Sequence, residues 1–205
     1  MQQSFFITGT DTEVGKTYIA CKLIKHYVAL GYKVVGMKPV AAGCDWVDGA
    51  WLNEDVKLLT AASNVQAPTH LVNPYSFKEP IAPHIAAQHE GVTIDLQVIV
   101  DAYQQLTQLA DIVIVEGAGG LLVPLGDDHT LADLVAQLNI PIILVIGLKL
   151  GCINHALLTY EVIQQRQLKL DSWLANPIDS SMLASADNLH TLKHKLAAVK
   201  QLVLD

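Results

Sequence analysis

One stretch near the N-terminus limits what this chain can fold into more than any other. Residues 4–7 form a short apolar run, residues 9–17 read Gly-Thr-Asp-Thr-Glu-Val-Gly-Lys-Thr, and apolar residues then recur at helical spacing to position 30. A strand, a glycine-bounded turn and a helix in this order form a phosphate-binding loop, whose backbone N–H groups converge on phosphate oxygens. Five residues separate Gly9 from Gly15, one more than in the common pattern. The stretch therefore predicts an α/β fold with a nucleotide site after its first strand.

The rest of the chain continues the alternation of strands and helices. Apolar and β-branched runs predict strands at 33–37, 111–115, 142–146 and 172–175. Helical spacing predicts helices at about 54–62, 83–88, 96–109, 131–138, 154–165 and 185–203. Residues 40–51 and 73–83 lack a clear period and are interpreted as loops. Because continuous apolar runs are typical of buried parallel strands, the pattern predicts an α/β, P-loop NTPase-like fold with a mostly parallel sheet, helices on both faces and a single domain spanning 1–205.

Composition and charge exclude several classes of protein. Thirteen Lys and Arg against twenty Asp and Glu leave a net charge of −7, and no basic run exists that could neutralise the phosphates of a nucleic acid. The longest nearly unbroken apolar stretch, 140–148, is too short to span a bilayer. Three widely spaced cysteines and no visible secretory signal favour reduced thiols in the cytoplasm. We therefore expect no nucleic-acid partner, no membrane partner and a cytoplasmic location.

Four side chains indicate how a nucleotide and its metal could be held. Lys16 would reach the β- and γ-phosphates, and the Thr17 hydroxyl would ligate Mg²⁺. Glu116 directly follows the strand at 111–115, and open α/β sheets bind ligands at the carboxyl ends of their strands. Asp55 can be interpreted as a further Mg²⁺ ligand or as an acid that stabilises a helix N-terminus, and its position alone does not decide between the two.

Two further features lie at the same predicted edge of the sheet. Lys38 closes the second strand, so its ammonium could meet a second anion beside the γ-phosphate or could face solvent. Residues 151–154 open a helix just after another strand, and their free N–H groups suit a carboxylate, although any helix start offers such groups. The histidines lack the spacing of metal ligands and are interpreted as surface or packing residues.

Five strings together resemble one enzyme family. They are GTDTEVGKT at 9–17, KPVAAG at 38–43, NPYSFKEPIAPH at 73–84, VEGAGG at 115–120 and KLGCINHALLT at 149–159. A phosphate-binding loop alone indicates only a nucleotide. In this order and combination, the strings resemble the dethiobiotin synthetases, the ATP-dependent ligases that close the ureido ring in biotin synthesis.

The resemblance implies a cyclo-ligase that uses ATP and Mg²⁺ and acts as a homodimer. Its substrates would be 7,8-diaminononanoate and CO₂, and its products dethiobiotin, ADP and phosphate. In the implied mechanism the diamine captures CO₂ as a carbamate, the γ-phosphoryl group moves to it to form a carbamic-phosphoric anhydride, and the second amine closes the ring. The partner subunit would hold the substrate carboxylate, so the substrate site would be shared across the interface.

The resemblance also assigns roles to residues of this sequence. The catalytic residues would be Thr12, Lys16 and Lys38, and the Mg²⁺ ligands would be Thr17, Asp55 and Glu116. Asn176 would contact the adenine. The full set of nucleotide-binding residues would be Glu13, Val14, Gly15, Lys16, Thr17, Tyr18, Asp55, Glu116, Gly117, Ala118, Gly119, Asn176 and Pro177. The diamine would be bound by Ala42, Cys152, Ile153 and Asn154. Ala42 stands where relatives commonly carry a serine, so one hydroxyl contact near the substrate would be absent.

A different class of protein is the alternative. P-loop ATPases of similar topology act as dimerisation switches that position other proteins or bind membranes. An apolar stripe in the last predicted helix, with lysines beside it, would suit a lipid surface, although such a stripe more often covers a sheet. The stripe consists of Leu189, Leu192, Leu196, Val199 and Val203. The extra lysine that those switches carry at the start of the loop is missing here, so the ligase is the preferred interpretation.

Overall fold

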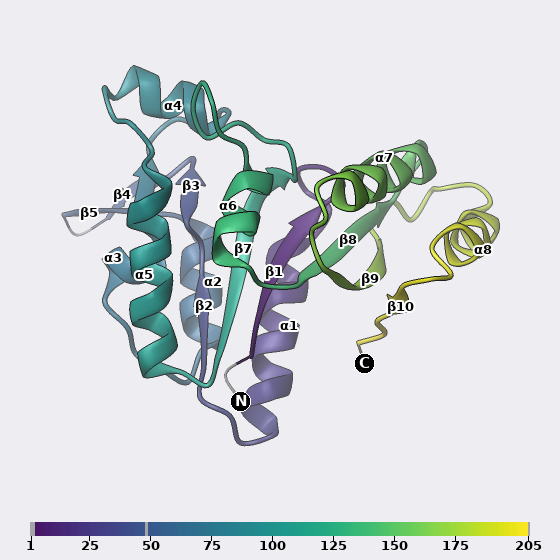
Figure 1. Cartoon of the computed structure of the whole chain (residues 1–205), viewed down its shortest axis with the longest axis horizontal. Coiled ribbons are helices and arrows are strands. Elements are labelled where there is room, and N and C mark those ends of the chain that lie inside the picture. The colour runs from purple at the N-terminus through teal and green to yellow at the C-terminus, as the bar shows by residue number, and fades with distance from the viewer. Residues whose placement is uncertain (1–2, 48, 205) are drawn as a thin grey trace.

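A six-stranded sheet forms the centre of the molecule (Figure 1). The computed structural model describes residues 3–47 and 49–204. The strands of this sheet are β1 (Gln3–Gly9), β2 (Val34–Met37), β7 (Ile112–Gly120), β8 (Ile142–Leu148), β9 (Leu170–Pro177) and β10 (Lys200–Gln201). They lie in the order β10-β9-β8-β1-β7-β2, and each neighbouring pair is parallel. The predicted α/β fold with a largely parallel sheet is confirmed.

Helices cover both faces of the sheet (Figure 1). One face is covered by α1 (Lys16–Ala29) and α2 (Glu54–Ala62). The other face is covered by α5 (Leu96–Leu109), α6 (Leu131–Leu138), α7 (Cys152–Gln165) and α8 (Ser185–Lys195). Two short helices, α3 (Thr69–Val72) and α4 (Pro83–His89), lie in the connection between α2 and α5. The sequence patterns did not reveal α3, which is a single turn.

Successive side chains of the central strands enter different cores. Phe5 and Ile7 of β1 pack in a cluster with Ile24 of α1, whereas Phe6 packs in the cluster on the opposite face with Leu106 of α5. Neighbouring side chains of a strand point to opposite faces, and here helices cover both faces. This is why the strands are continuous apolar runs rather than alternating ones.

The two segments interpreted as loops contain short strands, so that interpretation is wrong in part. They hold β3 (Val40–Ala42), β4 (Asp45–Val47), most of β5 (Ala50–Leu52) and β6 (Tyr75–Phe77). β3 pairs with β6 in parallel, and β4 pairs with β5 in an antiparallel hairpin. Three residues are too few to show a period of two, so such strands leave no readable pattern. Asp48, in the same segment, lies outside the described residues.

The last helix is shorter than predicted. α8 ends at Lys195 rather than at 203, and the chain continues into the edge strand β10 beside β9. Leu192 and Leu196 of the apolar stripe are fully buried in a cluster with Trp173. These stripe residues therefore cover the sheet, as the more common use of such a stripe predicts. Among the helices of the described residues, none has the length and apolar character needed to cross a membrane.

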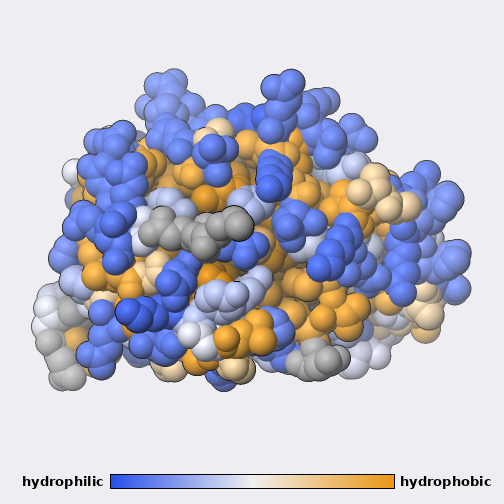
Figure 2. Space-filling view, turned by 60° about the horizontal axis from the view of Figure 1, so that its bottom comes forward, coloured by the Kyte–Doolittle hydropathy of each residue, from blue (hydrophilic) through white to orange (hydrophobic). Residues whose placement is uncertain are grey.

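The face of the molecule turned forward in Figure 2 mixes hydrophilic and hydrophobic residues. Hydrophilic residues cover much of its outline, and hydrophobic ones emerge between them. This mixture is expected, because charged residues make up only 16% of the chain and apolar atoms supply much of the surface of ordinary folded proteins.

Asp133 stabilises the first turn of α6. Its Oδ2 accepts hydrogen bonds from the backbone N–H and the hydroxyl of Thr130, the N-cap residue, at 2.7 and 2.6 Å. Its Oδ1 accepts a hydrogen bond from Arg166 at 2.8 Å. Burial raises the pKa of Asp133, but the hydrogen bonds from Thr130 and Arg166 outweigh burial and lower it. The ionised carboxylate therefore stabilises the folded state.

Replacing Asp133 by Ala should lower the free energy of unfolding by about 1 kcal/mol at pH 7, because the N-cap residue Thr130 loses the carboxylate that completes its capping box. Since the folded-state pKa lies below the unfolded value, this stabilisation is present above the unfolded pKa of about 3.9 and is lost as the pH falls through the folded pKa. Urea unfolding at pH 7 and pH 3 measures the change. Asp128→Ala, which removes an exposed carboxylate from the preceding loop, is the control. A cost that does not decline at pH 3 would contradict the assignment.

Candidate active site

A cleft of about 740 Å³ opens where the loops after β1, β2 and β7 meet. We call two parts of its lining the charged wall and the apolar wall. The charged wall consists of Lys16, Thr17, Lys38, Asp55 and Glu116. The apolar wall consists of Val40, Ala41, Ala42, Ile81, Pro83 and Val123. The cleft therefore suits a ligand that is anionic in one part and apolar in another.

The conformation of the phosphate-binding loop depends on glycine at position 15. Gly15, just before α1, has a φ of 88°, in the left-handed region that favours glycine. A Cβ at this position would also lie 2.1 Å from Nδ2 of Asn176, which donates a hydrogen bond to the Val14 carbonyl at 2.9 Å. Lys16 Nζ donates to the carbonyl of Asp11, in the same loop, at 3.0 Å. Both the backbone conformation and the available space therefore require glycine at position 15.

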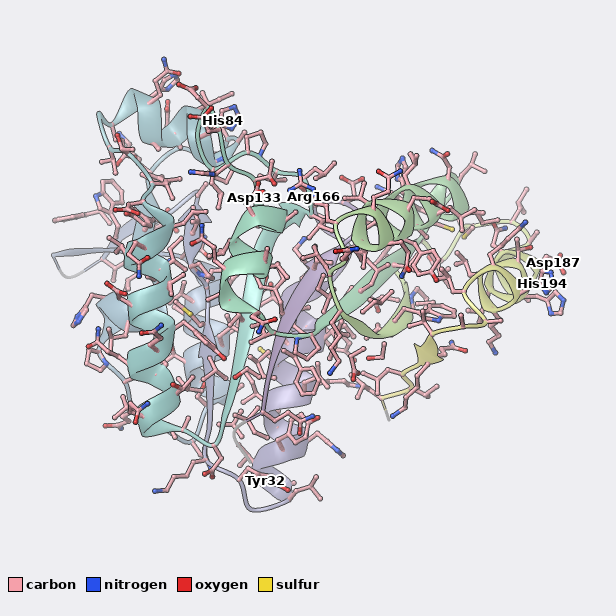
Figure 3. The ribbon with its side chains drawn as sticks, in the orientation of Figure 1. Tyr32, His84, Asp133, Arg166, Asp187 and His194 are labelled. Atoms are coloured by element: carbon pink, nitrogen blue, oxygen red, sulfur yellow. The ribbon has the colours of Figure 1, made fainter. Side chains whose placement is uncertain are left out.

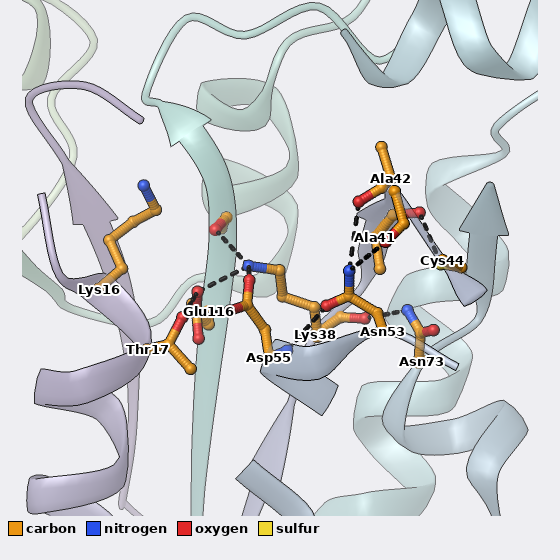
Figure 4. Close-up of polar contacts among 12 residues, drawn as sticks. Lys16, Thr17, Lys38, Ala41, Ala42, Cys44, Asn53, Asp55, Asn73 and Glu116 are labelled. Atoms are coloured by element: carbon orange, nitrogen blue, oxygen red, sulfur yellow. Dashed lines mark hydrogen bonds and ion pairs between the residues drawn. The ribbon is translucent and has the colours of Figure 1, made fainter. Parts of the chain in front are cut away.

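Lys38 lies between two carboxylates that come from different elements (Figure 4). Its Nζ is 2.7 Å from Asp55 Oδ2 in α2 and 2.6 Å from Glu116 Oε1 in β7. The Thr17 hydroxyl, in α1, lies 2.7 Å from Asp55 Oδ1 and 2.9 Å from Glu116 Oε1, and it donates its single hydrogen to one of them. Glu116 is fully buried and Lys38 is nearly so, whereas the Asp55 side chain is 37% exposed. The structure thus brings Thr17, Lys38, Asp55 and Glu116 together.

The charges in this cluster shift one another's pKa values. Burial lowers the pKa of Lys38, but the carboxylates of Glu116 and Asp55 outweigh burial and raise it. Burial raises the pKa of Asp55, but Lys38 outweighs burial and lowers it. The pKa of Lys16 is lowered to about 8, first by burial and then by repulsion from Lys38. Lys38 and Asp55 are therefore ionised at neutral pH, and Lys16 holds its proton less firmly than an ordinary lysine.

Two asparagines fix the backbone around the cluster, and the sequence had not indicated them as site residues. Asn73 Nδ2 donates to the carbonyl of Lys38 at 2.6 Å. Asn53 Nδ2 donates to the carbonyl of Ala42 at 3.2 Å, and its Oδ1 accepts from the backbone N–H of Asp55 at 3.0 Å. Both side chains belong to buried residues. The helix-capping position of Asn53 and the Asn-Pro-Tyr string at 73–75 are the sequence signals that could have found them.

The residues assigned through the family resemblance divide into two groups. Besides the charged wall, the cleft is lined by Thr12, Glu13, Gly15, Ala42, Ala118 and Gly119. Residues that do not line it in this chain are Val14, Tyr18, Gly117, Asn176 and Pro177. The first turn of α7 is likewise absent from the lining; it consists of Cys152, Ile153 and Asn154.

The donor set of the charged wall fits a magnesium ion that arrives with a nucleotide. Among the described residues, no group of three or more His, Cys, Asp or Glu side chains is placed to hold a metal by itself. Mg²⁺ is usually bound through one or two carboxylates, with water and substrate phosphates as the other ligands. Asp55, Glu116 and Thr17 supply two carboxylates and a hydroxyl. Oε2 of Glu116 is buried and has no hydrogen-bond partner within the described part of the chain, so it remains available as a ligand.

Replacing Lys38 by Met leaves the buried Glu116 carboxylate next to Asp55 with no cation between them. We expect the free energy of unfolding to fall by about 3 kcal/mol, the lower end for a broken buried ion pair, because Asp55 is partly exposed. Urea unfolding in EDTA measures the loss. Lys57→Met, at an exposed lysine of α2, is the control and should change stability by less than about 0.5 kcal/mol.

A second variant tests the cause of this loss. In Lys38→Met/Glu116→Gln the unpaired buried charge is removed, so most of the lost stability should return. A double variant no more stable than Lys38→Met would show that lost packing, rather than an unpaired charge, causes the effect.

Two comparisons with known proteins support the assigned fold. A family model described as an AAA domain matches residues 3–199. A ParA family ATPase from Chlorobium tepidum superposes with a TM-score of 0.57 over 98% of this chain and 82% of its own, at 15% identity. At this identity the likeness shows the fold alone, which is the P-loop NTPase-like α/β fold.

Two curated relatives are much more similar in sequence. A protein of Aromatoleum aromaticum named ATP-dependent dethiobiotin synthetase is 50% identical over 196 residues, which are 96% of this chain and 87% of the relative. A protein of the same name from Nitrosospira multiformis is also 50% identical over 196 residues, 96% of this chain and 85% of its own. The identity thus extends far beyond the motifs of the cleft. The chain belongs to the dethiobiotin synthetase family.

Proposed function

We propose that the protein converts 7,8-diaminononanoate, CO₂ and ATP to dethiobiotin, ADP and phosphate with the help of Mg²⁺. The observation that carries this proposal is one cleft in which Lys16, Lys38 and two carboxylates share the lining with an apolar wall. The charged wall suits phosphates and a carbamate, and the apolar wall suits the alkyl chain of the diamine. Membership of the dethiobiotin synthetase family favours this reaction over other uses of a P-loop.

The reaction proceeds in three steps. One amine of the diamine attacks CO₂ and loses a proton, which gives a carbamate. A carbamate oxygen then takes the γ-phosphoryl group of ATP, and ADP leaves. The second amine attacks the carbamate carbon, loses a proton and expels phosphate as the ring closes. No step needs a side-chain nucleophile, so the protein acts by holding the reactants together and by stabilising charge.

Lysines of the charged wall supply the positive charge for these steps. Lys16 would neutralise charge on the transferring phosphoryl group, and Lys38 would neutralise charge on the carbamate. Thr12 and Glu13 line the cleft beside the phosphate-binding loop. Asn176, which contacts that loop through Val14, would lie with Pro177 at the adenine. The cleft therefore contains both lysine ammonium groups before the substrates bind.

Thr17, Asp55 and Glu116 would hold the magnesium ion. When bound, Mg²⁺ neutralises charge on the phosphate oxygens of ATP. In this structure Lys38 supplies the positive charge between the two carboxylates, at 2.7 and 2.6 Å. Lys38 would be free to turn to the carbamate once the carboxylates bind the metal.

A homodimer would complete the substrate site. The first turn of α7 does not line the cleft of its own chain. The N–H of Cys152 donates to the carbonyl of Lys149, so the N–H groups of Ile153 and Asn154 would meet the carboxylate of a diamine held by a partner subunit. Leu150 and Leu158, next to and in α7, are 91% and 59% exposed. A contiguous exposed apolar patch is typical of an interface, and these two leucines would contribute to one. We propose that each chain acts as a single domain, 1–205, in such a cytoplasmic dimer.

Phosphate release from MgATP tests the proposed function. Release should require both 7,8-diaminononanoate and bicarbonate, and the product should have the mass of dethiobiotin. Release that is indifferent to the diamine would contradict the proposal and favour a nucleotide-driven switch.

Variants of the two lysines separate their roles. Lys16→Gln should abolish turnover, because the phosphoryl group loses its neighbouring cation. Lys38→Gln should still bind MgADP in calorimetry but should lose turnover by about a hundredfold or more, as for other groups that stabilise transition-state charge. Lys57→Gln is the matched control on α2. Undiminished turnover in Lys38→Gln would remove Lys38 from the mechanism.

A further inference from the structure

Asp11, in the phosphate-binding loop, makes three polar contacts. Its Oδ1 accepts from the backbone N–H of Thr12 at 2.8 Å. Its own carbonyl accepts from Lys16 Nζ at 3.0 Å. Its Oδ2 lies 2.7 Å from the ammonium of Lys149, which is 138 residues away in the sequence. The orientation of Asp11 therefore affects both the loop backbone and the side chain that would contact phosphate.

Lys149 comes from the corner between β8 and α7. Its carbonyl accepts from the backbone N–H of Cys152, the first residue of α7, at 3.0 Å. The strand before this corner also contacts the loop, since the N–H of Thr10 donates to the carbonyl of Val145 in β8 at 3.0 Å. The sheet therefore holds in place the segment from which Lys149 reaches Asp11.

We propose that Lys149 is a positioning residue that holds Asp11, and through it Lys16, in the conformation that binds nucleotide phosphates. This inference rests on the proposed function for its kinetic consequence. The ion pair is partly exposed, with side chains 36% and 42% accessible, so its effect on global stability is small. Its effect is local, because a loop already ordered before binding loses less entropy when the nucleotide binds. The hydrogen bond from Lys149 also lowers the pKa of Asp11, so the Asp11 carboxylate is ionised at neutral pH.

Lys149→Gln should raise the KM for ATP about two- to fivefold, the range expected for one exposed ion pair. The KM for the diamine and the melting temperature should stay unchanged, and Lys149→Arg should restore the KM for ATP. The control is Arg166→Gln, which breaks the ion pair between Arg166 and Asp133 (Figure 3). This pair resembles the Lys149–Asp11 pair, because its N–O distance is 2.8 Å and its side chains are 40% and 34% exposed. The control should leave the KM for ATP unchanged.

Binding of MgADP, measured by calorimetry, separates this inference from the proposed reaction. Lys149→Gln and Asp11→Asn should each weaken MgADP by the same two- to fivefold, and the double variant should be no weaker than either single variant. These results would stand even if wild-type protein made no dethiobiotin. Unchanged MgADP affinity, additive losses in the double variant, or a raised KM for the diamine alone would each overturn the positioning role.

Discussion

The buried contacts of Lys38 are the interaction on which the rest of the site depends. Lys38 directly follows β2, Asp55 lies in the first turn of α2, and Glu116 lies in β7. The Thr17 hydroxyl reaches both carboxylates from α1. Removing such charges from water is costly, and the cost is offset only while all partners are in place. The charged wall therefore assembles only when these four elements pack correctly.

Around this cluster, polar contacts hold backbone and side chains in position. Asn73 holds the carbonyl of Lys38, Asn176 holds that of Val14, and Lys149 holds the side chain of Asp11. Each contact joins segments that are far apart in the sequence. A reaction that needs no side-chain nucleophile depends on such preorganisation, because placing amines, carbamate and phosphate side by side supplies much of the rate.

The sequence predicted the features that leave a local pattern. Long apolar runs located the central strands, and the glycine-bounded loop with Lys16 located the phosphate end of the cleft. The strands β3 and β6 were missed because three residues show no period, and α8 was overextended because an apolar stripe continues past its end. Asp55 could be placed only through the family resemblance. The pairing of Asp11 with Lys149 leaves no sequence signal, since 138 residues separate the partners.

A crystal structure with Mg²⁺, a non-hydrolysable ATP analogue, the diamine and bicarbonate tests the central claim most directly. The quantity to measure is the position of the Lys38 ammonium, now 2.7 and 2.6 Å from Asp55 and Glu116. If the cluster is the reaction centre, Mg²⁺ will be bound by Thr17, Asp55 and Glu116, and Lys38 will have moved to the carbamate. Lys38 still bridging both carboxylates, with the metal bound elsewhere, would contradict the claim.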